Sequence, residues 1–536
     1  MSHSRYFKLS ITALALTRFL VSEAGNTKST RPNILFCLAD DATYYHFSAN
    51  GSRWVNTPVF DKVAKQGILF SNCYTANPKS GPSRSSILTG LYSWQSREAG
   101  NHNCNFPADL KVVTEALNEN GYEIAYTGKG WAPGNPGKTQ EGKSRELTGK
   151  AYQSKTLLPL TTEIDNNDYA ANFADFLNHN NGEKPWFFWF GSWEPHRNYE
   201  YGSGENMGRK TKSMIDDFPL FWPDNDSVRT DMLDYGFEIE YFDSQIGRLI
   251  NELEKRGILD NTIVIITSDN GMPFPRSKAN NYEYSAHMPL AILWKNGISN
   301  PGRTVTDYVN FVDFTPTFLD VSGQSVEKSG LQTPAGHSLT TIFKSNKEGR
   351  VESERNFTIS GRERDDYGRP QNQGYPIRSI FKDNFLYICN LKPNLYPVGN
   401  PETGYLDCDG SPTKSVILNL NRQHIDSTYW ALNFGIRTED ELYDLTNDKF
   451  CFNSLATNDL SKIKMNDLKM ELFAQLKLHK DPRMLGNGDV FDRYPYDNRE
   501  KVAWNFWENV VSGIIKNPWE WTGWVLKTDY ESNKSK

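Results

Sequence analysis

Continuous apolar runs alternate with amphipathic stretches along much of the chain. Short apolar runs bounded by polar or glycine-rich segments are typical of strands buried on both faces of a parallel sheet. Such runs predict strands over 34–39, 123–127, 186–190 and 262–267. Apolar residues at helical spacing predict helices over 57–66, 113–120 and 232–256. This alternation predicts an α/β domain whose large mixed sheet is sandwiched by helices.

The pattern changes from about residue 374 onward. Two apolar runs, 377–380 and 385–389, flank Lys382-Asp383-Asn384 and predict a β-hairpin. A strand is expected over 415–420 and a helix over 460–477. We therefore expect a main domain over 30–373 and a smaller C-terminal α+β domain over 374–536. Its tail carries five tryptophans, expected to wrap over the main body or, alternatively, to stack on sugar: Trp504, Trp507, Trp519, Trp521 and Trp524.

The N-terminus has the pattern of a secretory signal peptide. An apolar run over 9–21 follows Arg5 and Lys8 and precedes the small residues Ala24 and Gly25. We expect residues 1–25 to be that signal peptide and the protein to be periplasmic or secreted. No other stretch approaches the roughly 20 apolar residues that a transmembrane span requires.

Charge and cysteine content exclude other classes of protein. The chain has 59 Lys and Arg against 65 Asp and Glu, a net charge of −6 and no basic block, so no nucleic-acid partner is expected. The six cysteines are scattered without CxxC spacing, which argues against a zinc site. Export would permit one or two disulfides among them.

Acidic residues follow two of the predicted strands. Asp40-Asp41 comes after the strand over 34–39, and Asp269-Asn270 comes after the strand over 262–267. Open α/β sheets bind ligands at the carboxyl ends of their strands, and an all-oxygen cluster suits a hard divalent cation. Each pair alone would also fit a turn or a helix cap. Their shared position after buried strands favours metal ligation.

The segment Ser80-Gly81-Pro82-Ser83-Arg84 resembles the active-site signature of type I sulfatases. In that family a Cys or Ser at the first position is oxidised to formylglycine (3-oxoalanine). An unmodified serine is a poor nucleophile without a base, whereas the hydrated aldehyde offers two hydroxyls, one to attack sulfur and one to expel sulfate. A serine at this position resembles bacterial sulfatases that are matured by an anaerobic-type radical-SAM enzyme.

The resemblance covers about residues 31–456 and implies the alkaline phosphatase-like sulfatase fold. It implies Ca²⁺ with these ligands: Asp40, Asp41, modified Ser80, Asp269 and Asn270. It implies these catalytic residues: Ser80 as nucleophile, Arg84, Lys129 and Lys278 at the sulfate, and His196 as a general acid at the leaving oxygen. Ser268-Asp269-Asn270-Gly271 and Glu194-Pro195-His196-Arg197 are similar to the branch that contains heparan N-sulfatase (sulfamidase) and bacterial polysaccharide sulfatases.

One position departs from the family pattern. Sulfatases commonly have a histidine two residues after the lysine that corresponds to Lys129, and here Trp131 occupies that place. His102, or an acid at the metal, is a candidate to replace it, although His102 also fits a surface or core role. His287 is a further candidate for the pocket.

Substrate-binding residues are proposed from chemistry alone. The charged segment that holds Arg362, Arg364 and Arg369 is either a solvated loop or a binding site for a uronic acid or a second sulfate. Trp131 and Tyr282 are candidates for stacking on sugar.

The sequence therefore predicts a sulfatase that acts on a sulfated polysaccharide or oligosaccharide. Candidate substrates are algal ulvan or carrageenan and glycosaminoglycans. The alternatives are N-desulfation of the sulfamidase type, a phosphoryl or phosphonate hydrolase of the alkaline phosphatase superfamily, and a non-catalytic binder of sulfated glycans.

Overall fold

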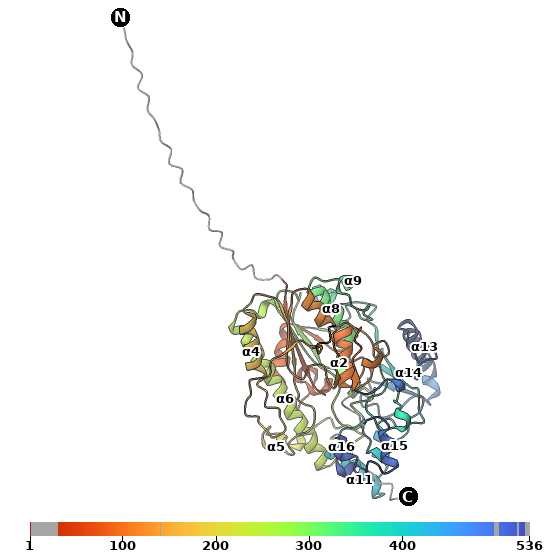
Figure 1. Cartoon of the computed structure of the whole chain (residues 1–536). Helices are drawn as coiled ribbons and strands as arrows, with labels where there is room; N and C mark the ends of the chain where they lie inside the picture. Colours follow the sequence, from red (N-terminus) through yellow and green to blue (C-terminus); the bar gives the residue numbers. More distant parts are fainter. Residues whose placement is uncertain (2–30, 140, 498–502, 523–524, 531–536) are drawn as a thin grey trace.

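The structure, a computed structural model, describes Met1 and residues 31–139, 141–497, 503–522 and 525–530. Its centre is an eight-stranded sheet in the order β12-β2-β11-β9-β1-β8-β5-β7 (Figure 1). The strands are β1 Asn33–Ala39, β2 Ile68–Phe70, β5 Glu123–Gly128, β7 Lys150–Ala151, β8 Trp186–Gly191, β9 Thr262–Ser268, β11 Leu290–Leu293 and β12 Arg303–Val305. β9, β1, β8 and β5 run parallel, whereas β11 is antiparallel to β9. The expected α/β fold with a large mixed sheet is confirmed.

Both faces of this sheet are buried at its centre, as β1 shows. Phe36 and Leu38 of β1 join the apolar cluster on one face, Leu35 and Cys37 join the cluster on the other, and all four are fully buried. This is why the strand reads as a continuous apolar run. The helices of the two layers are α2 Ser80–Thr89, α3 Val113–Glu119 and α8 Phe314–Val321 on one face and α1 Pro58–Gln66, α4 Tyr169–Asn180 and α6 Asp226–Lys255 on the other. Figure 1 shows α4 and α6 across the sheet from α2 and α8.

Helix α6 begins earlier than the apolar pattern predicts. Its N-cap is Asn225, whose side chain accepts a hydrogen bond from the N–H of Val228. The first turns also carry Asp231, which is buried and paired with Arg197. Because a buried acid interrupts the apolar periodicity, the pattern alone places the start of this helix too late.

A second, antiparallel sheet has the order β14-β15-β16-β17. Its strands are β14 Phe357–Arg362, β15 Ile377–Lys382, β16 Phe385–Asn390 and β17 Asp440–Asp444. β15 and β16 form the expected hairpin, and α13 (Lys462–Leu478) packs against both. The sheet begins ahead of residue 374, since β14 pairs with β15 along its whole length.

The strand expected over 415–420 is wrong, because these residues lie in α11 (Pro412–Arg422). Ser411 caps this helix by accepting a hydrogen bond from the N–H of Lys414, and Pro412 lies in its first turn. Ile417 and Leu418 are fully buried, and α11 packs against α6. A short apolar run fits one face of a helix as well as a strand. The N-cap Ser411 and the first-turn Pro412 are therefore the signals that identify this segment as a helix.

The C-terminal segment packs over the main body where it is described. Phe506 of α15 (Phe506–Val511) joins Tyr367, Leu406 and Tyr496 in one apolar cluster. The tryptophans of the tail contribute unequally: Trp504 and Trp521 are exposed, Trp507 and Trp519 are half-buried, and Trp524 lies outside the described residues.

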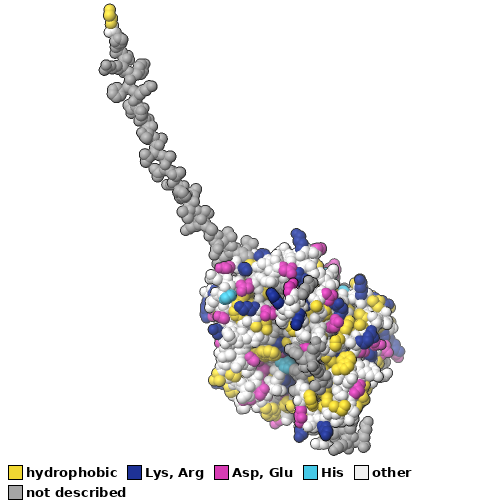
Figure 2. All heavy atoms as spheres, in the orientation of Figure 1, with side chains coloured by type: hydrophobic (Ala, Val, Ile, Leu, Met, Phe, Trp, Pro, Cys, Tyr) yellow, Lys and Arg dark blue, Asp and Glu magenta, His cyan; other side chains and the backbone are white. Residues whose placement is uncertain are grey.

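The structure bears on the expected disulfides and on membrane-spanning segments, but it describes little of the expected signal peptide. All six cysteines are buried with free thiols, so the permitted disulfides are not formed. Apart from Met1, the expected signal peptide over 1–25 lies outside the described residues. Among the helices that are described, none has the length and apolar character to cross a membrane. Acidic and basic side chains are interspersed on the face drawn in Figure 2.

A buried ion network connects the second sheet to the segment after α13. Arg378 of β15 donates to Glu363 at 2.5 Å and to Asp481 at 2.7 Å, and all three side chains are fully buried. We predict that Arg378→Ala lowers the free energy of unfolding by about 3–5 kcal/mol in urea titrations, because it leaves the buried carboxylate of Asp481 without its cation, whereas Glu363 keeps Arg483. Lys464→Ala is the control, since it removes an exposed pair with Asp383 and should cost less than about 1 kcal/mol. Equal losses in the two variants would contradict this assignment.

Candidate active site

Two strand ends bring the acidic pairs together. β1 and β9 are parallel neighbours with Ala39 opposite Ser268, so the residues that follow them emerge side by side. Helix α2 begins at Ser80 beside both pairs. The Ser80 hydroxyl lies 3.1 Å from Oδ1 of Asp40 and 3.3 Å from Oδ1 of Asn270. The five residues proposed as metal ligands therefore share one location.

The acidic residues form a group that fits a divalent cation. One oxygen from each of Asp40, Asp41 and Asp269 lies within 4.8 Å of the others, and all three side chains are fully buried. Burial, reinforced by Asp40, raises the pKa of Asp269 to about 6, and burial raises the pKa of Asp41 to about 6 although Lys278 opposes the shift. Anions crowded together away from water are stabilised by a cation, and an oxygen-only group suits a hard one.

Arg84 stabilises the acidic group rather than lining the pocket. Its Nε donates to Asp269 at 2.9 Å and its Nη2 to Asp40 at 3.3 Å. Its Nη1 donates to the carbonyl oxygens of Lys129 and Gly130, and the side chain is fully buried. The guanidinium therefore holds the carboxylates in place from behind.

Two lysines face the pocket beside Ser80. Lys129 Nζ donates to Asp40 at 2.6 Å, and Lys278 Nζ donates to Asp41 at 2.7 Å and to Asp409 at 3.0 Å. Burial lowers the pKa of Lys129, whereas Asp409 and Asp41 raise the pKa of Lys278 in spite of its burial. Two cations at one end of a pocket form a site for an anion such as sulfate.

His196 lies between the acids and the pocket. Its Nδ1 is 2.7 Å from the carbonyl oxygen of Arg197, so Nδ1 carries the proton and Nε2 faces Asp41 Oδ2 at 3.8 Å. Burial, together with the nearby Lys278, lowers the pKa of His196 to about 4. The ring is therefore neutral at neutral pH, and an anionic ligand would favour its protonation.

These groups open into a cavity of about 170 Å³. It is lined by Asp40, Lys79, Ser80, His102, Lys129, Ala132, Pro133, Trp193, His196, Lys278, Asp366 and Asp409. Six of these residues are not predicted from the sequence: Lys79, Ala132, Pro133, Trp193, Asp366 and Asp409. Lys79 and Trp193 adjoin recognised motifs and could have been found there, whereas Asp409 has no local signal because it reaches the pocket from a remote loop.

His102 is the only one of the proposed substrate-binding residues that lines this cavity among the described residues. Trp131 donates from Nε1 to Ser85 Oγ at 2.9 Å and borders a neighbouring cavity of about 250 Å³. His287 is buried between Tyr44 and Tyr74 and pairs with Glu283. The structure therefore does not bring Trp131 or His287 to Ser80.

The three arginines of the charged segment also lie away from the pocket. Arg362 and Arg369 are fully buried and both donate to Asp407, at 3.0 and 2.5 Å. Arg364 donates to the carbonyl oxygen of Tyr494 and stacks on Tyr496. The segment is neither a solvated loop nor a cationic wall of this cavity, since its arginines are buried and bond to Asp407 or to backbone carbonyl oxygens.

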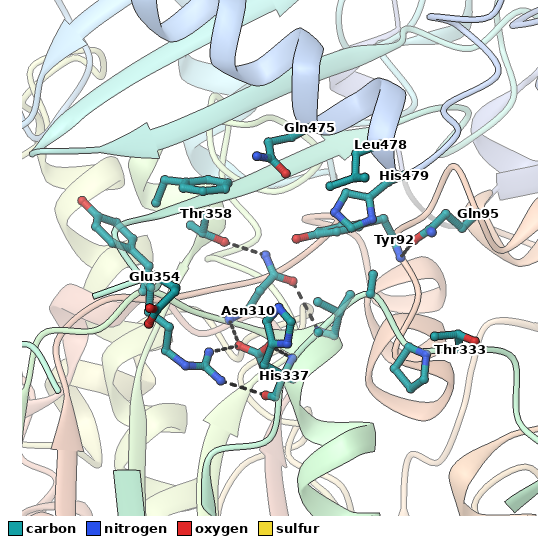
Figure 3. A pocket seen from close by; sticks show the side chains of 18 of the residues that line it. Tyr92, Gln95, Asn310, Thr333, His337, Glu354, Thr358, Gln475, Leu478 and His479 are labelled. Carbon is teal, nitrogen blue, oxygen red and sulfur yellow. Dashed lines mark hydrogen bonds and ion pairs between the residues drawn. The ribbon is translucent and has the colours of Figure 1, made fainter. Parts of the chain in front are cut away.

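A larger cavity, about 570 Å³, lies between α13 and the main body. Figure 3 shows Gln475 and Leu478 of α13, with His479 directly after the helix, on one side of it, opposite Asn310 and Thr358. No residue that the sequence proposed for catalysis or binding lines this cavity.

The comparison with known families agrees with the geometry. Residues 32–324, more than half of the chain, match the model of the family described as Sulfatase. The chain belongs to the sulfatase family. It is therefore a sulfuric ester hydrolase, and since sulfatases generally use formylglycine with a divalent metal, the buried acidic group is the candidate for holding that ion.

The sequence similarity to two known relatives covers most of this sulfatase. An ulvan-active sulfatase of Formosa agariphila is 26% identical and covers 86% of this chain and 82% of its own length. The N-sulphoglucosamine sulphohydrolase of Homo sapiens is 26% identical and covers 81% and 88%.

Solved structures share the sulfatase fold. One, a complex with its substrate D-glucosamine-2-N,6-O-disulfate, has a TM-score of 0.59 at 22% identity and covers 84% of this chain and 98% of its own. Another, from work on the metabolism of multiple glycosaminoglycans by Bacteroides thetaiotaomicron, has a TM-score of 0.62 at 17% identity and covers 87% and 100%.

We predict that Ca²⁺ added to chelator-treated protein raises its melting temperature, by an amount equivalent to about 3 kcal/mol at a hundredfold excess over Kd. Asp269→Asn should abolish this response, because it removes a carboxylate from the buried group. Asp409→Asn is the matched control and should keep the response, since Asp409 is paired with Lys278. Loss of the response only in Asp409→Asn would place the ion at Asp41, His196 and Asp409 instead.

Proposed function

We propose that this sulfatase removes sulfate esters from a sulfated polysaccharide or oligosaccharide, outside the cytoplasm, with a nucleophile derived from Ser80. The observation that carries the proposal is the position of Ser80. It starts α2 in contact with Asp40 and Asn270 and lines the same cavity as Lys129 and Lys278. A sulfate group in this cavity would meet two lysines at the point where the nucleophile stands.

The chain's own residues divide the work of binding and proton transfer. Lys129 and Lys278 would bind the sulfate oxygens and oppose the charge that develops on them. His196, whose Nε2 faces the pocket side, would take up a proton when the anionic substrate binds and deliver it to the leaving oxygen of the sugar. Arg84 would hold Asp40 and Asp269 in position.

Two groups complete the site. Asp40, Asp41, Asp269 and Asn270, with residue 80, would hold Ca²⁺, which would supply positive charge near the nucleophile. Formylglycine at position 80, in its hydrated form, would supply one hydroxyl to attack sulfur and a second to expel sulfate. The encoded serine fits conversion by an anaerobic-type radical-SAM maturing enzyme.

The substrate class is supported by the relatives, whose names include an ulvan-active sulfatase and an N-acetylglucosamine-6-O-sulfatase of Bacteroides thetaiotaomicron. The human relative, which acts on N-sulphoglucosamine, makes N-desulfation the second candidate. Sulfate release from oligosaccharides of defined structure, with either O- or N-linked sulfate, separates the two. Preference for a phosphate ester with Zn²⁺ would instead indicate a phosphoryl hydrolase, and the proposal would fail.

We predict that Ser80→Ala lowers the rate of sulfate release by about 10⁴-fold or more, because it removes the precursor of the nucleophile. The measurement uses protein made with a suitable maturing enzyme, and mass analysis of the peptide that contains residue 80 checks for the aldehyde. Ser86→Ala is the matched control on the same helix, where the hydroxyl donates to the Pro82 carbonyl oxygen, and it should remain active. Sulfate release by Ser80→Ala would refute the assignment of the nucleophile.

A further inference from the structure

Three ionisable side chains of the cavity have no place in the sulfate-binding group. Lys79, His102 and Asp366 are all buried, and they line the same cavity as Ser80. Asp366 accepts from Lys79 Nζ at 2.7 Å and lies 3.1 Å from His102 Nδ1. Lys79 immediately precedes Ser80, so this group of three bonded side chains lies beside the nucleophile.

The orientation of His102 is fixed from three sides. Its Nδ1 faces the Asp366 carboxylate, so Nδ1 carries the proton and Nε2 keeps a lone pair. Its backbone N–H donates to the carbonyl oxygen of Arg364. On the ring edge that includes Nε2, the carbon Cδ2 would lie 3.3 Å from a Cβ built on Gly81. The unprotonated edge of the ring is therefore next to the first turn of α2.

Asp366 is held as a carboxylate. Lys79 and His102 lower the pKa of Asp366 well below its usual range, although its burial acts in the opposite direction. Asn103 Nδ2 donates to the same Oδ1 that faces His102, at 3.1 Å. A carboxylate that accepts from Nδ1 fixes the tautomer of a histidine and stabilises its protonated form, which is the arrangement of a general base.

We propose that His102, oriented by Asp366, is the base that releases sulfate from the nucleophile at position 80. The inference rests on the proposed function. The remaining hydroxyl of the sulfated hydrate gives its proton to His102 Nε2, and its electron pair forms the C=O bond while the C–O bond to sulfate breaks. Sulfate leaves, the imidazolium loses its proton to solvent, and a water molecule adds to the aldehyde to restore the hydrate.

The other candidates for this step are engaged elsewhere. Asp40 and Asp41 each accept from a lysine, and the acidic group they form is the candidate for the cation. His196 is anchored on the Arg197 carbonyl beside Lys278, on the sulfate-binding side of the cavity. Trp131 has no basic nitrogen and bonds to Ser85. His102 also lines the cavity, and its ring is neutral at neutral pH because burial lowers its pKa to about 4 although Asp366 opposes the shift.

The test follows the covalent state of position 80 as well as turnover. His102→Ala and His102→Gln are matured, mixed with a sulfated substrate, quenched, and the peptide that contains residue 80 is weighed. We expect the peptide to carry the added mass of one sulfate group in most molecules, because attack proceeds while release slows. Steady-state sulfate release should fall by about 10²–10⁴-fold, the usual contribution of a general base.

Asp366→Asn tests the positioning role. Its amide keeps the size of the side chain but removes the charge that stabilises protonated His102, so the same sulfated peptide should accumulate to a smaller extent. His479→Gln is the matched control, since it changes a partly buried histidine that contacts Tyr92 in the distant cavity. This variant should show neither accumulation nor loss of rate, and melting curves of all variants confirm that they fold.

The outcomes separate this inference from the proposed function. Slow turnover without the sulfated peptide in both His102 variants, or unchanged turnover, would overturn the role of His102. Absence of both the aldehyde and sulfate release in the wild-type protein would instead overturn the proposed function. Accumulation in His102→Ala and His102→Gln, with active wild-type and His479→Gln proteins, supports the base.

Discussion

The carboxylates of Asp40, Asp41 and Asp269 are the feature on which the rest of this site depends. All three are fully buried at the ends of two neighbouring strands, and such a concentration of negative charge is unstable without cations close to it. Arg84, Lys129 and Lys278 supply them, and each comes from a different segment of the chain. The sheet, α2 and two loops must therefore assemble together for any of these charges to be tolerated.

The three cations that neutralise these carboxylates differ in their access to the cavity. The guanidinium of Arg84 contacts two carboxylates and two carbonyl oxygens, and the side chain is fully buried. The lysines each bind an acid but still line the cavity, so a ligand can share them. An anionic group that enters the pocket would meet ammonium groups that the acids already hold in place. The side chains would then need little rearrangement when negative charge develops on a substrate.

The parts that the sequence predicts well are local. The apolar runs that form β1 and β9 end at Asp40-Asp41 and near Asp269-Asn270, so strand prediction also places the acids at one edge of the sheet. The segment over 415–420 was misassigned because its apolar run is too short to separate helix from strand, while Ser411 and Pro412 gave the helix start. For Arg362 and Arg369 the sequence leaves both a solvated loop and a substrate site open, because nothing near them reveals Asp407, their buried partner.

The remaining wall of the cavity is made by contacts across the whole chain. Asp366 and Asp409 lie on loops after β14 and before α11, and Tyr367 and Leu406 on these loops pack with Phe506 of the C-terminal segment. Residues that follow β1, β5, β8 and β9, together with the start of α2, form the end of the cavity that holds the two lysines, whereas the loops with Asp366 and Asp409 form the opposite wall. Because those loops carry no motif of their own, substitutions there can change which substrate the cavity accepts while the end with the two lysines stays the same.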